Sequence, residues 1–358
     1  MRRAAAITAA LAVFAAALAL AAVRDDDVGR YGPPSVSARL NDVVAAGVPG
    51  VLVRVVDRGR TIHLAQGVAN RETGAELRAS DRFRVGSITK TFVAAIVLQL
   101  AAERRVDLDS PVDSWLPGLV DKRITVRQLL SHRSGLADYV DDARIVSGHA
   151  ASNRRLAEAA LGRLPVAAPG ERYAYSSTNY LVLGLLVERI TGNDLEHELR
   201  TRIFRPLGLR STAFEPAVVR LRVHGYRPAI HDGIVSGEPE DTAGESAAWL
   251  WSAGAVVSDA ADLARFFDGL LAGRVVPKPL LAEMIPAQGY GLGLAAFTTP
   301  CGTAVGHSGN VSGYVSVAWV DDEARRTVVL MANSYPLGPE ADAAVHRALD
   351  DAFCSAND

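Results

Sequence analysis

Strand-forming sequence at both ends of the chain, separated by a long helical block, is the feature that most constrains the fold. Near the N-terminus, two runs rich in β-branched residues flank Asp57-Arg58-Gly59, which is typical of a β-hairpin. Short β-rich segments return only after Tyr290. We therefore predict an α+β fold in which N- and C-terminal strands share one antiparallel sheet, flanked by N- and C-terminal helices, with a large all-helical insert.

The predicted sheet domain comprises residues 30–86 and 286–358, and the mainly helical domain comprises residues 87–285. Helical spacing over residues 36–47, and a last helix over about 340–352, would supply the flanking helices. The chain has 358 residues, 49% of them hydrophobic, which is enough to bury a core of this size. We expect the active site between the two domains.

The chain begins with a segment typical of export. Two arginines precede an unbroken apolar run from Ala4 to Val23, after which charges resume. This is the pattern of a secretory signal peptide, residues 1–23, with small residues suited to cleavage near its end. The run is also long enough to span a bilayer, so an uncleaved anchor is the alternative. In both cases we expect a secreted or cell-envelope protein, associated with a membrane only if the anchor is kept.

Two cysteines, Cys301 and Cys354, are present. In an exported protein an even number of cysteines favours a disulfide, and two buried free thiols are the alternative. Neither has a C-x-x-C or histidine-rich neighbourhood, so we expect no zinc site.

The charge balance and the missing motifs exclude several partners. The net charge is −2, with both signs spread along the chain, so we expect no nucleic-acid partner. H-E-x-x-H, Walker and G-x-S-x-G motifs do not occur. The stretch "GLGLAA" matches the spacing of a dinucleotide-binding motif, but that motif must be followed by a helix. The sequence Thr298-Thr299-Pro300-Cys301-Gly302 would break such a helix, so we do not predict a dinucleotide site. We therefore predict neither a cofactor nor a metal.

A serine and a lysine stand three positions apart at the start of the most apolar helical segment, in "RVGSITKTF". On a helix, Ser87 and Lys90 would share one face. Only three of the 38 Lys and Arg residues are lysines, so a lysine kept among Ile88, Phe92 and Val93 is informative. Burial lowers a lysine pKa, and a neutral amine can accept a proton, which arginine cannot. The alternative is an ordinary N-cap serine and a lysine that extends to solvent.

Two further segments contain candidate catalytic side chains. "RYAYSSTNY" places Tyr175 and Ser177 just before a helix, where a phenol near a cation could ionise more easily and act as a base. "VGHSGNVSGY" places His307 on a strand, followed by glycines that allow close approach of a substrate. His132, in "LLSHRSGL", is interpreted as a structural residue that stabilises a turn. Taken alone, each of these side chains is more often structural.

In order, S-I-T-K, Y-S-S and H-S-G resemble the three motifs of the penicillin-recognising serine hydrolases. The chain is most similar to the serine D-alanyl-D-alanine carboxypeptidases related to class C β-lactamases. Supporting stretches are "ITVRQLLSHRSGL", "SAGAVVS" and "YGLGL", and the similarity runs from about Gly47 to Cys354. The resemblance implies a β-lactamase/DD-peptidase-like fold. The carboxypeptidase branch also has a cysteine pair placed like Cys301 and Cys354.

The resemblance also implies a role for each matching residue. Ser87 would be the nucleophile that accepts the acyl group, with Lys90 taking its proton and Tyr175 passing a proton to the leaving amine. The backbone N–H groups of Ser87 and Asn310 would form the oxyanion hole. The remaining substrate-binding residues would be Ser177, Trp249, His307, Ser308 and Gly309.

Two departures from the family pattern bear on the substrate. Ser177 stands where the second motif usually ends in asparagine. A carboxypeptidase must also bind a terminal carboxylate, and an arginine that makes two hydrogen bonds is suited to that task. The strand after "YGLGL" has no arginine there and continues as Ala295-Ala296-Phe297. An apolar pocket there would favour an ester, an amide or a differently substituted peptide.

The sequence therefore predicts an exported serine hydrolase that forms an acyl-enzyme on Ser87. The favoured activity is D-alanyl-D-alanine carboxypeptidase, acting on peptidoglycan peptides or related D-amino-acyl substrates. The alternatives are an esterase, a D-amino-acid amidase or peptidase, a class C-like β-lactamase, and, in another class, a non-catalytic wall-binding or sensor protein. The expected partners are small peptides, esters or β-lactams, together with cell-wall peptidoglycan.

Overall fold

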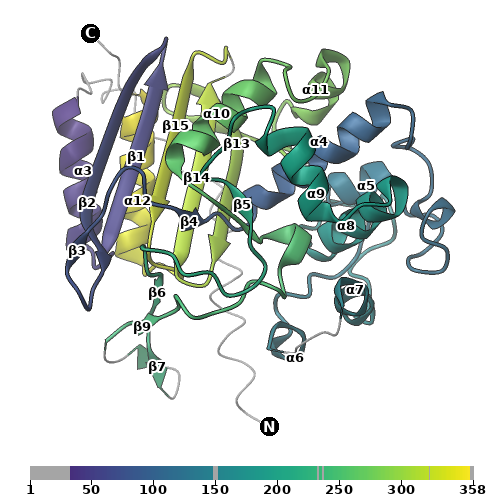
Figure 1. Cartoon of the computed structure of the whole chain (residues 1–358), viewed down its shortest axis with the longest axis horizontal. Helices are drawn as coiled ribbons and strands as arrows, with labels where there is room; N and C mark the ends of the chain where they lie inside the picture. Colours follow the sequence, from purple (N-terminus) through teal and green to yellow (C-terminus); the bar gives the residue numbers. More distant parts are fainter. Residues whose placement is uncertain (1–32, 148–151, 232–233, 236–237, 322, 355–358) are drawn as a thin grey trace.

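The computed structural model describes residues 33–147, 152–231, 234–235, 238–321 and 323–354 (Figure 1). The predicted leader, residues 1–23, lies outside these ranges. None of the helices within them is long and apolar enough to cross a membrane.

The N- and C-terminal strands form one antiparallel sheet, as predicted. Its eight strands follow the order β11-β12-β13-β14-β15-β1-β2-β3. The bounds are β1 (Gly50–Asp57), β2 (Arg60–Asn70), β3 (Ala75–Glu76), β11 (Gly289–Tyr290), β12 (Ala295–Thr299), β13 (Gly302–Val311), β14 (Tyr314–Asp321) and β15 (Arg326–Ala332). The two ends of the chain meet where β1 pairs with β15, with Val51 opposite Ala332.

The predicted hairpin is the β1–β2 pair. Asp57 pairs with Arg60, and the two residues between them, Arg58 and Gly59, have φ angles of 47° and 82°. Positive φ at both central positions is the turn geometry that matches the twist of the flanking strands. The turn therefore sets the register that places alternate β1 residues on opposite faces of the sheet.

Helices cover both faces of the sheet (Figure 1). α3 (Pro33–Ala45) and α12 (Pro339–Cys354) pack against each other and on one face, around a core that includes Leu40 and Leu349. α10 (Ala260–Leu271) packs on β14 and β15 from the other face. Thus α10, although it lies in the sequence of the predicted helical block, is part of the sheet's covering layer.

The two cysteines form a disulfide. Cys301, in the turn between β12 and β13, is bonded to Cys354 at the end of α12, with the Cα atoms 5.5 Å apart. The bond attaches the last helix to an end of the sheet.

The remaining helices form a second, mainly helical group beside the sheet (Figure 1). Its helices are α4 (Ile88–Ala102), α5 (Val126–Leu130), α6 (Ala143–Val146), α7 (Asn153–Leu161), α8 (Thr178–Thr191), α9 (Leu195–Leu199) and α11 (Lys278–Met284), with short helical turns at Val112–Ser114, Arg200–Phe204 and Trp251–Ala253. Short strands pair as β4 (Phe83–Arg84), β10 (Val256–Ser258) and β5 (Ala213–Phe214), as β6 (Tyr226–Arg227) with β9 (Glu240–Asp241), and as β7 (Ile230–His231) with β8 (Ile234–Val235).

α4 connects the helical group to the sheet. It contacts α8 and α9 on one side and β13 on the other, which explains why its sequence is apolar on nearly all sides. Phe92 stacks on Phe266 of α10, with ring centroids 3.8 Å apart. The start of α4 therefore lies where the helices meet the sheet.

β13 has a free edge beside the start of α4. Its pairing with β12 ends at Gly306, whereas its pairing with β14 continues to Val311. A Cβ on Gly309 would lie 1.9 Å from the Val85 carbonyl oxygen, and a Cβ on Gly86 would lie 2.8 Å from the Asn310 nitrogen. Two glycines thus let the backbone of β13 contact the turn that precedes α4.

Candidate active site

Ser87 and Lys90 form a hydrogen-bonded pair at the start of α4. The Lys90 Nζ donates to Ser87 Oγ over 2.8 Å and to the carbonyl oxygen of Ala253 over 2.9 Å. Ser87 precedes the helix but makes no side-chain capping bond, and Lys90 is fully buried. Both features exclude the alternative of an ordinary cap serine and a solvent-exposed lysine.

Burial changes the protonation of Lys90. Desolvation lowers the pKa of Lys90 from 10.5 to about 7, while the nearby Asp138 carboxyl acts in the opposite direction. Close to half of the Lys90 side chains are therefore neutral at pH 7. A neutral amine 2.8 Å from a hydroxyl can take the hydroxyl proton, which makes Ser87 a candidate nucleophile.

The backbone of Ser87 lies close to the backbone of Asn310. The Ser87 N–H has no hydrogen-bond acceptor within the described part of the chain. At Gly86 and Gly309 the backbone of β13 contacts the turn before α4, so the backbone of Asn310 lies against that turn. A Cβ on Gly309 would lie 2.8 Å from the Ser87 nitrogen. The structure thus brings together the two amides that sequence comparison predicted as an oxyanion hole.

Tyr175 is beside this pair, immediately before α8. The Lys90 Nζ lies 5.1 Å from the centre of the Tyr175 ring. Burial raises the pKa of Tyr175 well above 10, and a hydrogen bond with Ser87 only partly opposes that rise. Burial of the phenol therefore works against the prediction that Tyr175 ionises more easily. Tyr175 is a protonated phenol, suited to donate a proton.

His307 is held in one tautomer and is uncharged. Its Nδ1 faces the carbonyl oxygen of Ser308, so Nδ1 must carry the proton, and Nε2 accepts from Tyr290 Oη over 2.9 Å. Burial, together with Lys90, lowers the pKa of His307 to about 3. The third motif therefore supplies no positive charge.

Ser177 lies beside a carboxyl group that the sequence analysis missed. The Asp138 Oδ1 accepts the Ser177 N–H over 3.0 Å, whereas Oδ2 makes no hydrogen bond to any described residue. Burial is the largest influence on Asp138 and raises its pKa, although Lys90 lowers it. None of the sequence motifs points to Asp138, and only the fold shows that it is near Lys90.

Trp249 and Ser308 occupy less central places. Trp249 is half-buried, and its carbonyl oxygen accepts from Tyr139 Oη over 2.6 Å. That bond links Trp249 to the segment that includes Asp138. Ser308 is half-buried on the free edge of β13, next to His307.

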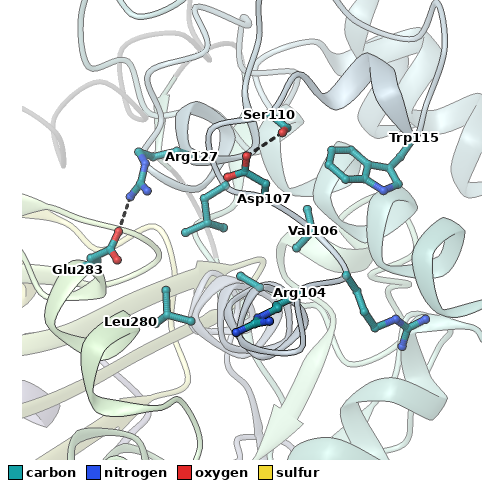
Figure 2. Close-up of a pocket in the computed structure, with 11 residues that line it drawn as sticks. Arg104, Val106, Asp107, Ser110, Trp115, Arg127, Leu280 and Glu283 are labelled. Carbon is teal, nitrogen blue, oxygen red and sulfur yellow. Dashed lines mark hydrogen bonds and ion pairs between the residues drawn. The ribbon is translucent and has the colours of Figure 1, made fainter.

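A separate cavity of about 520 Å³ opens at the other end of α4 (Figure 2). Arg104, Trp115 and Leu280 are among the residues that line it. α4 has 15 residues, so about 22 Å of helix separates this cavity from Ser87. None of the predicted site residues lines it. Within the described ranges, no group of three or more His, Cys, Asp or Glu side chains could hold a metal ion.

The sequence profile of the Beta-lactamase family matches residues 36–353. The chain belongs to the Beta-lactamase family. A D-stereospecific amidohydrolase from Streptomyces sp. has a similar solved structure, 31% identical, with a TM-score of 0.80 over 91% of this chain and 100% of that one. The D-amino acid amidase from Ochrobactrum anthropi SV3, solved with L-phenylalanine amide, is 26% identical, with a TM-score of 0.80 over 89% and 96% of the two chains.

Curated relatives of the family have several activities by name. Penicillin-binding protein 4 of Amycolatopsis lactamdurans is 32% identical over 61% of this chain and 58% of its own length. Esterase EstB of Burkholderia gladioli is 33% identical over 53% of this chain and 55% of its own length. A D-aminopeptidase of Brucella anthropi is 28% identical over 80% of this chain and 56% of its own length. The chain spans somewhat more than half the length of these relatives.

Proposed function

We propose that the protein hydrolyses amides or short peptides of D-amino acids whose α-amino group is free, through an acyl-enzyme on Ser87. The observation that carries the proposal is the charge arrangement around Ser87. Among the described residues, Asp138 Oδ2 has no hydrogen-bond partner, and no arginine makes a hydrogen bond or ion pair to a site residue. His307 is neutral. Such a site suits an ammonium group better than a terminal carboxylate.

Acylation begins with the transfer of the Ser87 hydroxyl proton to neutral Lys90. The Ser87 oxygen then forms a bond to the substrate carbonyl carbon, whose oxygen becomes negative. The backbone N–H groups of Ser87 and Asn310, whose segments lie in close contact, would stabilise that negative oxygen.

Release of the amine requires a proton on its nitrogen. Tyr175 donates that proton as the carbon–nitrogen bond breaks, and it recovers one from protonated Lys90. The charge returns to its starting distribution, and the acyl group remains on Ser87. Water then attacks the ester carbonyl by the same steps in reverse, which releases the acid and the Ser87 hydroxyl.

The substrate amine is the specificity element. A substrate ammonium near Asp138 would favour the ionised carboxylate, whose pKa burial otherwise raises. Preference for the D configuration is supported by the named activities of the Streptomyces amidohydrolase and the Brucella D-aminopeptidase.

Kinetics on matched substrates test the proposal. We expect D-phenylalanine amide to be cleaved with a higher kcat/KM than its L enantiomer or its N-acetyl derivative. Asp138→Asn should reduce the preference for the free amine over the acetylated amide by roughly tenfold, the value of one charge-assisted contact. Asp141→Asn is the matched control, because Asp141 is an exposed carboxylate three residues away.

Other outcomes would overturn the proposal. Faster cleavage of the acetylated amide, or an Asp138→Asn variant with unchanged preference, contradicts the role of the amine. The second candidate is D-alanyl-D-alanine carboxypeptidase, which similarity to penicillin-binding protein 4 favours. A D-Ala-D-Ala peptide as the best substrate would support that candidate. No adduct on Ser87 with any amide, ester or penicillin would exclude a serine hydrolase.

We also infer that the protein acts outside the cytoplasm. The apolar run from Ala4 to Val23 and the bonded pair Cys301–Cys354 support this inference. Fractionation of cells that express the full chain tests it: protein confined to the cytoplasm would contradict export.

A further inference from the structure

We propose that His132 is a positioning residue that holds Tyr175 in place for proton donation to the leaving group. The inference rests on the proposed function, because it requires Tyr175 to be the proton donor. His132 follows α5 and is fully buried. It was interpreted from sequence as a turn residue, and it has no part in the acylation steps described above.

The imidazole of His132 is attached to the segment that includes Tyr175. Its Nδ1 accepts the backbone N–H of Ser176, the next residue after Tyr175, and the Nδ2 of Asn179, each over 3.1 Å. Asn179 is itself oriented by Ser134, whose Oγ donates to Asn179 Oδ1. A backbone N–H can only donate, so Nδ1 carries no proton and the neutral ring is protonated on Nε2. The tautomer and the orientation of the ring are thereby defined.

The ring of His132 also contacts the ring of Tyr175 directly. The two centroids are 4.2 Å apart and the planes are inclined by 30°. His132 also packs against Tyr290, with ring centroids 4.7 Å apart and ring planes inclined by 67°. The Tyr290 hydroxyl donates a hydrogen bond to His307 Nε2. His132 therefore connects the segment of Tyr175 to the strand of His307 through packed rings.

Burial, with Lys90 nearby, lowers the pKa of His132 well below its ordinary value, so the stacked ring is uncharged. The Nε2 atom of His132 is buried and has no hydrogen-bond partner among the described residues. Its contribution therefore comes from the Nδ1 bonds and from ring packing, and these can be removed separately.

Two substitutions separate these contributions. His132→Asn keeps an acceptor near the Nδ1 position but loses the ring, while His132→Phe keeps a ring but loses the acceptor. The backbone at this position has a φ of 55°, a left-handed conformation that asparagine adopts readily. The asparagine variant should therefore be the better folded of the two.

The measurement compares an amide with an activated ester of the same acyl group. An amine cannot leave without a proton, whereas p-nitrophenolate can, so a misplaced Tyr175 should slow only the amide. We expect the ratio of kcat/KM for the amide to that for the p-nitrophenyl ester to fall by roughly tenfold or more in both variants. This ratio does not depend on the fraction of protein that is folded.

Tyr175→Phe and Phe266→Leu complete the experiment. In a Tyr175→Phe background, a His132 substitution should have no further effect on the ratio, because the positioned group is gone. Phe266→Leu disturbs a buried ring stack away from Tyr175, so it should lower the melting temperature and leave the ratio unchanged.

The inference is overturned by an equal loss of amide and ester hydrolysis in both His132 variants. It is also overturned if His132 substitutions change the ratio as much without the Tyr175 hydroxyl as with it. A wild-type protein that cleaves the ester but no amide overturns the proposed function, and this inference with it. Normal wild-type amide activity with unchanged ratios in the variants overturns the inference alone.

Discussion

Replacing Lys90 by arginine tests the base that activates Ser87. With a pKa of about 7, close to half of the Lys90 side chains are neutral at pH 7. An ordinary lysine with a pKa of 10.5 would be neutral in only about one molecule in 3,000, and an arginine in fewer than about one in 10⁵. Since only the neutral form accepts the Ser87 proton, we expect acylation to slow by about 10³-fold or more at pH 7.

The same reasoning gives the pH dependence of the wild-type protein. The neutral amine is the reactive form, so kcat/KM should rise with pH and reach half of its plateau near pH 7. Stopped-flow acylation with a p-nitrophenyl ester, followed from pH 5 to pH 9, measures this profile. Mass spectrometry of the acylated protein should place the added group on Ser87.

The chain offers matched controls, because its other two lysines, Lys122 and Lys278, are exposed. Lys122→Arg and Lys278→Arg should acylate at the wild-type rate. A Lys90→Arg variant within tenfold of the wild type, or a wild-type profile that is flat from pH 5 to pH 9, would refute Lys90 as the proton acceptor. Thermal melts establish that each variant is folded.

Three further predictions concern stability and the oxyanion hole. Lys90→Met should be inactive yet more stable than the wild type at pH 7. In the wild type, the low pKa of buried Lys90 lowers the free energy of unfolding at pH 7 by about 4 kcal/mol, because the unfolded chain binds the proton more tightly. The difference should shrink as the pH rises from 7 toward 10.5, and urea unfolding that shows the opposite trend would contradict it. Gly309→Ala should abolish acylation, since the added Cβ would lie 2.8 Å from the Ser87 nitrogen; near-normal acylation would count against the predicted hole. Replacing Cys301 and Cys354 by serine removes a disulfide between residues 53 positions apart, and it should lower the free energy of unfolding by about 4 kcal/mol. An unchanged urea midpoint would show that the disulfide is not formed.

Local sequence was sufficient to predict the main elements and to single out the Ser87–Lys90 pair. The hairpin at Asp57-Arg58-Gly59 was predictable because its turn chemistry is local, and burial of α4 was predictable because its apolar residues occupy nearly every side. The lysine in an arginine-rich chain pointed to Lys90 before any contact was known.

Other parts of the site depend on contacts that no local pattern specifies. Asp138 comes next to Lys90 only because α5 and the loop after it pack against the start of α8. The raised pKa of Tyr175 also depends on the fold, because a sequence motif does not show how completely the phenol is buried.

By itself, the sequence determined which side chains are available for chemistry: a serine and a lysine one helical turn apart, a tyrosine before a second helix, and a histidine on a strand. The tertiary structure decided their protonation states and their mutual positions. The physical reason is that a pKa depends on desolvation and on charges brought close by the fold, which lie far apart in the chain. The neutral form of Lys90, the uncharged His307 and the contact of His132 with Tyr175 all arise where the helices meet the sheet.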